Sequence, residues 1–128
     1  MSARFDAMGI VVSDVPTSVA FYELLGLEFP REQGEGHVEA LLARGLRLML
    51  DSESVVESFD PTWERPIGRG RIGLAFLCDD PADVDATHER IVAVSHRSHL
   101  EPFDAPWGQR YASVLDPDGN VIDLFAPR

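Results

Sequence analysis

Residues 12–19 of the chain read Val-Ser-Asp-Val-Pro-Thr-Ser-Val, and residues 77–84 read Leu-Cys-Asp-Asp-Pro-Ala-Asp-Val. In both stretches Asp, Pro and Val stand at the same relative places, after an apolar run and before residues at helical spacing. A repeat at about half the chain length indicates two copies of one supersecondary unit. Two small β-rich units can form a cleft between them, and clefts are where proteins bind small molecules.

Each copy of the repeat joins a predicted strand to a predicted helix. Residues 6–13 and 72–78 are apolar runs of the kind that form strands. Pro16 and Pro81 stand where the first turn of a helix accepts proline, each close to an aspartate that can cap the helix or interact with its dipole. The sequence therefore predicts a strand followed by a helix at the start of each half.

The rest of each half is predicted to be mostly strand. A hairpin is expected to turn at Arg44-Gly45, and Asp-Pro-Asp-Gly-Asn at 116–120 is a strong turn signal in the second half. Including the two strands that precede the helices, the predicted strands are 6–13, 27–31, 38–43, 46–50, 72–78, 99–103, 109–115 and 120–125. Both halves therefore have the element order βαβββ.

This order predicts an α+β fold in a single domain, residues 1–128, built from paired βαβββ modules. Module one covers about residues 1–52 and module two about residues 71–128. Between them, residues 53–70 are polar, contain several Pro and Gly, and are expected to form a connecting loop. Two helices cover only one face of the strands, so the opposite face is left open.

Side-chain alternation assigns residues to the covered and the open face. The covered face receives the bulky members of the first and fifth strands, Met8, Ile10, Val12, Leu74, Phe76 and Cys78. The opposite parity places small residues such as Ala7, Gly9 and Gly73 on the open face, where they leave room for a ligand. In the neighbouring strands the open face carries Arg47, Met49, Asp51, Gln109, Tyr111, Ser113, Val121, Asp123 and Phe125.

The chain is strongly acidic, because 22 Asp and Glu against 11 Lys and Arg give a net charge of −11. Such a surface repels nucleic-acid phosphates and anionic lipids, so neither is an expected partner. It favours a cationic small molecule, although the same charge can serve solubility alone. The single Cys78 excludes a disulfide framework, and neither a membrane-spanning stretch nor a signal peptide is found, so a cytoplasmic location is expected.

Three stretches carry a resemblance to a known family. Residues 9–14, Gly-Ile-Val-Val-Ser-Asp, with Phe21-Tyr22, and residues 116–124, Asp-Pro-Asp-Gly-Asn-Val-Ile-Asp-Leu, resemble the vicinal oxygen chelate superfamily. That group includes glyoxalases, extradiol dioxygenases, fosfomycin-resistance transferases and bleomycin-resistance proteins. Pro106-Trp107-Gly108 is most similar to the bleomycin-resistance and glyoxalase-like branch. The resemblance covers nearly the whole chain and implies a cupped mixed sheet, helices on its outer face, and a homodimer.

The resemblance also implies where a divalent metal would bind. Enzymes of the superfamily use a His on the first strand, a His or Gln on the fifth, a Glu on the eighth and in some members a Glu on the fourth. The matching positions here are Ala7, Gly73 (Ile72 if the register slips), Asp123 and the neighbourhood of Met49. Only Asp123 has a donor, and one carboxylate does not make a three-ligand catalytic site. We therefore expect no metal, no other cofactor and no catalytic residue of the usual metal chemistry.

The residues expected to contact a ligand are Met49, Trp63, Trp107, Tyr111 and Asp123. Trp107 can stack on a flat or cationic ligand, and Trp63 can act as an aromatic residue of a lid, while packing in the core or a dimer is the alternative for both. Of the other polar residues, Arg110 is expected to point away from this face or to pair with a carboxylate. His88 is expected on an exposed helix face.

Three functions are compatible with this pattern. The favoured one is a non-catalytic small-molecule binding protein of the glyoxalase/bleomycin-resistance type that sequesters a cationic antibiotic or metabolite. The alternative is a divalent-metal-dependent lyase, isomerase or dioxygenase with atypical ligands, for example Asp123 with Glu39, Asp51 or a His from a partner subunit. The third is a degenerate paralogue that serves as an interaction subunit. The identity of the ligand, any remaining catalysis and the pathway stay open, as does a swap of modules between subunits.

Overall fold

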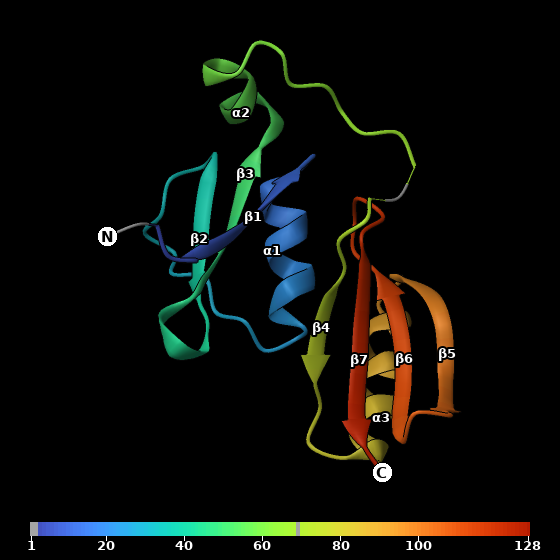
Figure 1. Cartoon of the computed structure of the whole chain (residues 1–128). Coiled ribbons are helices and arrows are strands. Elements are labelled where there is room, and N and C mark those ends of the chain that lie inside the picture. Colours follow the sequence, from blue (N-terminus) through green and yellow to red (C-terminus); the bar gives the residue numbers. More distant parts are fainter. Residues whose placement is uncertain (1–2, 69) are drawn as a thin grey trace. The chain divides into compact units, whose positions relative to one another are not determined.

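The computed structural model describes residues 3–68 and 70–128 (Figure 1). The chain divides into two compact units, Met1–Arg65 and Pro66–Arg128. Each unit has a mixed sheet, with strand order β1-β3-β2 in the first unit and β4-β7-β6-β5 in the second. Helices and mixed sheets together confirm the predicted α+β fold class. Among the described residues, none of the helices has the length and apolar character that crossing a membrane requires.

The described residues of the first unit form three strands and two α-helices. β1 pairs in parallel with β3, and β2 pairs antiparallel with β3. A single 3-10 turn, η1, joins β2 to β3 at the predicted hairpin, where Arg44 and Gly45 both have positive φ angles. The bounds are β1 (Ala7–Val12), α1 (Val15–Glu23), β2 (His37–Leu41), η1 (Ala43–Gly45), β3 (Arg47–Ser52) and α2 (Glu53–Phe59).

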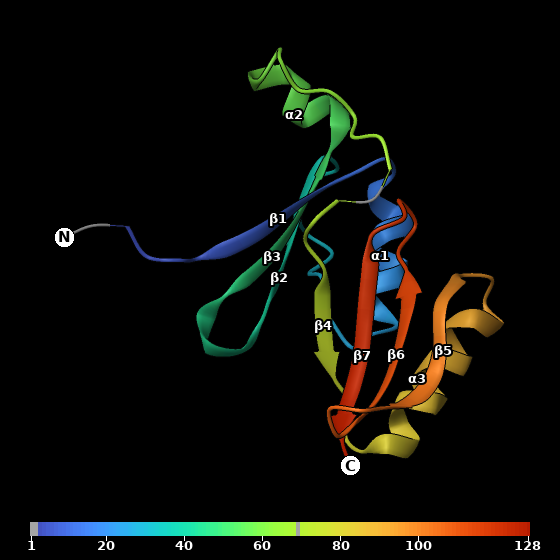
Figure 2. The same ribbon diagram turned by 45° about the vertical axis from the view of Figure 1, so that its right-hand side comes forward.

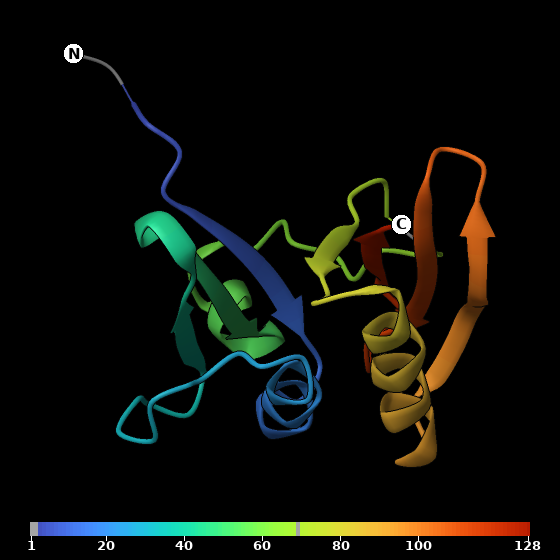
Figure 3. The same ribbon diagram turned by 90° about the horizontal axis from the view of Figure 1, so that it is seen from below.

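The second unit has the predicted order of one strand, one helix and three strands. β4 pairs in parallel with β7, and β6 lies between β7 and β5 with antiparallel pairing to both. Figure 3 shows α3 lying along one face of this sheet. The bounds are β4 (Leu74–Leu77), α3 (Pro81–Ala93), β5 (Arg97–Ala105), β6 (Gln109–Leu115) and β7 (Val121–Pro127).

An aspartate caps the first helix of each unit. The Asp14 carboxylate accepts a hydrogen bond from the Thr17 amide at 3.0 Å, and the Asp80 carboxylate accepts one from the Asp83 amide at 2.8 Å. Each cap satisfies an amide that has no partner within the helix, which is worth about 1 kcal/mol. In the repeat Asp14 is matched by Asp79, yet the cap of the second helix is the next residue, so the two copies differ by one position.

Alternating burial on β3 and β7 confirms the parity predicted for these strands, while on β6 Ser113 is buried although it has the opposite parity. On β3, β6 and β7 the residues on the covered face are fully buried, namely Leu48, Leu50, Ala112, Val114, Ile122 and Leu124. In the second unit Val84 and Ile91 of α3 are fully buried as well, and α3 packs on β5, β6 and β7. Gly9, Ala75 and Leu77, on the opposite parity of β1 and β4, are exposed. Burial of such aliphatic side chains contributes about 1.5–3 kcal/mol each and holds each helix or strand in place.

The strand expected at residues 27–31 does not form, so the first sheet has three strands. Pro30 has no amide hydrogen, and the side chain of Gln33 bonds to both backbone polar groups of Glu39 on β2 instead. Its Nε2 donates to the Glu39 carbonyl at 2.9 Å, and its Oε1 accepts from the Glu39 amide at 2.7 Å. A side chain thus makes the edge contacts that a further strand would make.

The segment expected to be a connecting loop begins with a helix, α2. The Ser52 hydroxyl accepts a hydrogen bond from the Val55 amide at 3.1 Å and caps this helix, and Glu53 occupies the first turn, where an acidic residue is favoured. Val56 is buried against the unit, which holds the short helix in place. Residues 60–68 and 70 are irregular, as Figure 2 shows, and residue 69 lies outside the described part of the chain.

His88 is buried, with an exposed fraction of 5%, so the prediction of an exposed histidine is wrong. The buried side of α3 contains His88, because residues spaced by three or four positions face the same side of a helix; the other buried residues are Val84, Thr87 and Ile91. The His88 Nε2 atom lies 2.7 Å from the Ser98 hydroxyl on β5. A hydrogen bond between helix and sheet thereby compensates the burial of the ring.

Candidate functional site

The face of the second sheet opposite α3 carries the candidate site. Because Ala112, Val114, Ile122 and Leu124 are buried on the covered face, Tyr111, Ser113 and Asp123 project from the other one. Ser113 and Asp123 are direct cross-strand partners on β6 and β7, and Asp123 is also the partner of Ala75 on β4. The parity assignment of these residues is therefore confirmed by the strand register.

Three aromatic rings gather at one end of this face. Phe103 on β5 is the cross-strand partner of Tyr111 on β6, with ring centroids 5.9 Å apart. Trp107, in the turn between these strands, lies 5.4 Å from the Tyr111 ring and 6.3 Å from the Phe103 ring, and all three pairs meet edge to face. Gly108, with a φ of +90°, makes this turn possible. We call Phe103, Trp107 and Tyr111 the aromatic cluster.

Trp107 is fixed in orientation although 59% of it is exposed. Its indole Nε1 donates a hydrogen bond to Gln109 Oε1 at 2.8 Å. An exposed aromatic ring that is held by a hydrogen bond and by two neighbouring rings loses little conformational freedom when a ligand binds to it. The aromatic cluster is thus a preformed surface for an apolar or cationic group.

Tyr111 links the aromatic cluster to Asp123. A hydrogen-bond interaction with the Asp123 carboxylate on the neighbouring strand is one of the influences on the pKa of its hydroxyl. Burial of the phenol, with further contributions from this hydrogen bond and from the negative charge of Asp123, raises the pKa of Tyr111 to about 12. The phenol is therefore protonated at neutral pH.

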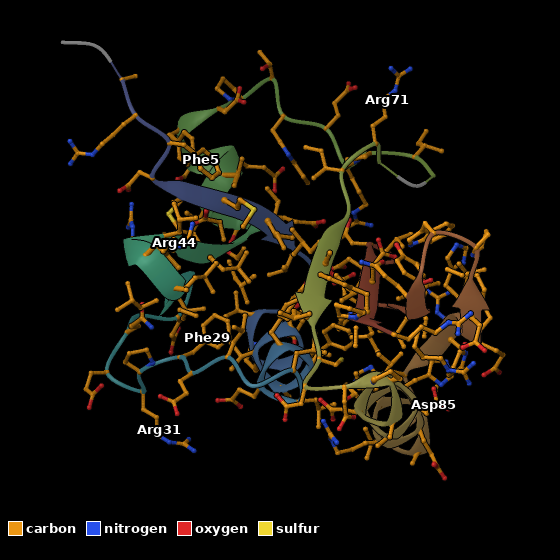
Figure 4. The ribbon with its side chains drawn as sticks, turned by 60° about the horizontal axis from the view of Figure 1, so that its bottom comes forward. Phe5, Phe29, Arg31, Arg44, Arg71 and Asp85 are labelled. Atoms are coloured by element: carbon orange, nitrogen blue, oxygen red, sulfur yellow. The ribbon has the colours of Figure 1, made fainter. Side chains whose placement is uncertain are left out.

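A hollow lies beside Asp123 at the start of β4. It has a volume of about 240 Å³ and is lined by Gly70, Arg71, Ile72, Gly73, Asn120 and Val121. Asp123 is not a lining residue of the hollow, but a Cβ at Gly73 would lie 3.9 Å from Asp123 Oδ2, so the carboxylate lies close to the Gly73 side of the hollow. The Arg71 side chain extends away from the sheet (Figure 4). The hollow therefore offers space next to the carboxylate.

The corresponding face of the first unit carries a network of paired charges. Arg47 donates to Glu39 at 2.7 Å and to Asp6 at 2.5 Å. The His37 ring lies between two carboxylates, with Nε2 2.7 Å from Glu39 and Nδ1 2.5 Å from Asp51. These contacts raise the pKa of His37, chiefly through Asp51, and lower the pKa of Glu39. We call these five residues the charge network.

Two of the predicted ligand contacts belong to the first unit. Met49 projects from β3 on the same face as the charge network, and its Cε would lie 3.6 Å from a Cβ at Gly9. Trp63 follows α2, and its amide donates to the Asp60 carbonyl at 3.2 Å. Within the second unit the structure places Trp107 beside Tyr111, and Tyr111 near Asp123. Contact with a ligand stays a prediction for all five residues, Met49 and Trp63 included.

Phe103 is a member of the aromatic cluster that the sequence did not single out. Phe103 could have been found from the pairing of β5 with β6, which places it opposite Tyr111. A bulge in β5 shifts the register, so counting residues back from the turn does not reveal this pairing.

Arg110 behaves as predicted and pairs with carboxylates. Its guanidinium bonds to both oxygens of Asp85 at 2.8 and 2.9 Å, and Asp85 lies on α3 (Figure 4).

The residues at the positions implied for a metal do not fit one. Ala7, Gly73 and Met49 supply no nitrogen or oxygen donor from their side chains, which leaves the single carboxylate of Asp123. Gly73 does lie beside Asp123, so within the second unit the positions adjoin as the resemblance requires, but one of the two donors is absent. Within residues 3–68 and 70–128, no group of three or more His, Cys, Asp or Glu side chains is placed to hold a metal ion.

Comparison with known proteins identifies the fold and the family. The family model described as Glyoxalase/Bleomycin resistance protein/Dioxygenase superfamily matches residues 4–124. A glyoxalase/bleomycin resistance protein/dioxygenase family enzyme from Burkholderia phytofirmans PsJN has a TM-score of 0.86 at 17% identity, with 98% of this chain and 100% of that chain covered. No curated protein sequence matches.

Two further examples of similar structures are both from Agrobacterium tumefaciens. A protein of unknown function is 28% identical, with a TM-score of 0.75, and the match covers 100% of this chain and 97% of that one. A lactoylglutathione lyase is 22% identical, with a TM-score of 0.70 and coverage of 98% and 94%. At such low identity the likeness to the lyase concerns the fold alone.

Proposed function

This chain belongs to the glyoxalase/bleomycin resistance protein/dioxygenase superfamily, and within it we propose a non-catalytic binding protein for a small cationic organic molecule. The ligand would lie on the aromatic cluster with its positive charge at Asp123. Sequestration of an antibiotic or a metabolite requires only affinity, which aromatic surface and a carboxylate together provide.

The main support for this proposal is that Trp107, Tyr111 and Asp123 lie close together on one face of the second sheet. The aromatic faces attract a cation by about 0.5–2 kcal/mol each, and a carboxylate adds charge attraction at the same place. The overall charge of −11 raises the local concentration of cations around the protein. The lack of side-chain donors at Ala7 and Gly73 supports binding without the metal chemistry of the family's enzymes.

Fluorescence of Trp107 tests the proposal. The Trp63→Phe variant leaves Trp107 as the single tryptophan, and it is titrated with a cationic glycopeptide antibiotic of the bleomycin type and with small aromatic amines. We expect saturable changes that are weakened by Tyr111→Phe and Asp123→Asn. Glu57→Gln, on the exposed side of α2, removes the same charge elsewhere and is the matched control. No saturable change with any cationic compound would refute the binding role.

Calorimetric titrations with the same compounds test the predicted contacts of Met49 and Trp63, as the fluorescence titrations test those of Trp107, Tyr111 and Asp123. If Met49 and Trp63 contact the ligand, Met49→Ala and Trp63→Phe weaken binding relative to the unmodified protein, measured by calorimetry. The homodimer also stays a prediction, and light scattering of the purified chain with and without the antibiotic tests it.

The alternative function is that of a metal-dependent enzyme. Its support is the similarity in fold to a lactoylglutathione lyase. Its suggested ligands Glu39 and Asp51 are both bound to His37 in the charge network. Elemental analysis of the purified protein separates the two functions. Stoichiometric, tightly held metal that is lost in Asp123→Asn would establish the alternative and overturn the proposal.

A further inference from the structure

Asp123 differs from the other carboxylates on the uncovered sheet faces in having no cationic side chain beside it. In the charge network Asp6 and Glu39 pair with Arg47, and Asp51 pairs with His37. In the part of the chain that the structure describes, no ion pair involves Asp123, and its partner is the neutral hydroxyl of Tyr111. A half-buried carboxylate without a cation is poorly compensated, so this position favours a cation from outside the protein.

Ser113 adds a second, independent sign that a group is absent at this place. It is fully buried, and its hydroxyl oxygen has no hydrogen-bond partner among the described residues. Ser113 stands directly opposite Asp123 across the pairing of β6 and β7, on the same face of the sheet. A buried hydroxyl without a partner costs free energy, so native proteins rarely leave one unless another group completes it.

The polar atoms around Asp123 are mostly hydrogen-bond acceptors. The carboxylate has about four lone-pair positions, and the Tyr111 hydroxyl is the neighbouring group whose pKa it raises. The Ser113 hydroxyl oxygen and the Tyr111 oxygen have further lone pairs. A positive group with several N–H donors is the partner that uses most of these lone pairs.

We propose that the ligand carries N–H donors on its cationic group, as a primary ammonium, amidinium or guanidinium does, joined to an apolar or aromatic body. This inference rests on the proposed binding function and narrows its ligand class. The N–H groups would bond to Asp123 and to the Ser113 hydroxyl, and the body would lie on the aromatic cluster. A quaternary ammonium keeps the charge but has no hydrogen to donate, so it leaves both acceptors without partners.

The surroundings of Asp123 provide the space that such a head group needs. Gly73 and Ala75 on one side of Asp123 have no side chain beyond a methyl group, and the hollow of about 240 Å³ opens beside Gly73. The carboxylates of the charge network in the first unit do not need a donor from a ligand, because each of them already accepts a hydrogen bond from Arg47 or His37. The donor requirement is therefore specific to the face of the second unit.

A set of three matched probes tests the donor requirement. Benzylamine, benzyltrimethylammonium and benzyl alcohol share one ring and differ in charge and in donors. Their dissociation constants are measured by isothermal titration calorimetry at neutral pH on the full chain. We expect benzylamine to bind about 10-fold or more tightly than benzyltrimethylammonium, as charged hydrogen bonds predict, and benzyl alcohol to bind weakest.

Ser113→Ala separates the role of the hydroxyl from folding. The change removes a buried polar atom that has no partner, so the melting temperature of the free protein should stay level or rise by a few degrees. The preference for benzylamine should nevertheless shrink about threefold or more. Ser113→Thr keeps the hydroxyl and serves as the conservative variant, and Ser98→Ala, at the buried His88, is a control that leaves the preference unchanged.

The outcomes distinguish this inference from the proposed function. If both cations bind equally, or benzyltrimethylammonium binds more tightly, the donor requirement is wrong and the binding function stands. If Ser113→Ala leaves the preference intact, Ser113 has no part in it. If no probe binds, and the titrations of Trp107 fluorescence are also flat, the proposed function itself fails.

Discussion

The uncovered faces of the two sheets have the same backbone plan and opposite chemistry. In each unit a strand that precedes a helix pairs in parallel with a later strand, β1 with β3 and β4 with β7. On the first face Arg47 and His37 neutralise the carboxylates around them. On the second face the aromatic cluster lies beside Asp123, which forms no ion pair with any residue that the structure describes. The carboxylates on the first face are paired within the protein, whereas Asp123 on the second face is available to pair with a cation of the ligand.

The difference shows that the sheet positions determine where a site lies while the side chains determine what it binds. Asp51 and Asp123 both project from the strand that pairs in parallel with the first strand of their unit. His37 is next to Asp51, whereas Ala75 and Ser113 are next to Asp123. A cationic ligand therefore gains an unpaired carboxylate only on the second face.

Neutralising the two aspartates is expected to give the largest contrast. Asp123→Asn should weaken binding of a cationic aromatic amine about 10- to 100-fold, because it removes a charged hydrogen bond. Asp51→Asn should leave the affinity unchanged, since its partner is His37. Calorimetric titration of both variants measures the difference. Equal losses in the two variants would remove the distinction between the faces.

Truncation of the exposed ring is expected to have the next largest effect. Trp107→Ala should weaken binding about 5- to 30-fold, because a cation–π contact of about 1–2 kcal/mol is lost. Trp107→Phe should restore part of the affinity, as a smaller ring keeps the aromatic face. Calorimetry is again the measurement, and full affinity in Trp107→Ala would place the ligand away from the aromatic cluster.

The charge network should make the stability of the protein depend on pH through His37. Hydrogen bonds to Asp51 and Glu39 raise the pKa of His37 above its ordinary value of 6.5. A group whose pKa is raised on folding stabilises the protein fully below pH 6.5, and that stabilisation disappears as the pH rises through the higher folded pKa. Because the ring is partly exposed, the loss should be at most about 1 kcal/mol.

Melting curves at several pH values compare the wild-type chain with His37→Gln. The variant should lack the loss of stability above pH 6.5, while Asp123→Asn should retain it. The same slope in wild type and His37→Gln would show that another group causes the pH dependence.

Substitutions in the hairpin turns of the two units should change the free energy of unfolding in opposite directions. One substitution introduces a glycine and the other replaces a glycine by alanine. Arg44 has a φ of +62°, a region that residues with a Cβ rarely adopt, so Arg44→Gly should stabilise the protein by about 0.5–1 kcal/mol. Gly119, in the turn before β7, has a φ of +87°, so Gly119→Ala should destabilise it by about 1 kcal/mol. Urea unfolding measures both, and two shifts of equal sign would contradict this reading of the turns.

The sequence predicts those parts of the fold that depend on neighbouring residues. β6 forms at the predicted residues 109–115, and both helix starts follow from an aspartate one or two residues before a proline. Alternation placed Tyr111 and Asp123 on one face because side-chain direction along a strand has a period of two. These features need no knowledge of distant contacts.

What the sequence could not predict depends on contacts between distant segments. The side chain of Gln33 bonds to Glu39 where a strand was expected. Burial of His88 follows from packing on β5, and Phe103 joins the aromatic cluster only once β5 has paired with β6. The charge network likewise requires β2, β3 and the segment before β1 to come together. Such pairings appear only in the folded chain.

Amide chemical-shift mapping with a cationic glycopeptide antibiotic of the bleomycin type tests the central claim most directly. If the second sheet binds the ligand, the shifts should concentrate at residues 103–113 and 121–125 and decrease strongly in Asp123→Asn. Shifts concentrated on β2 and β3, around His37 and Asp51, or a complete lack of saturable shifts, would contradict the account.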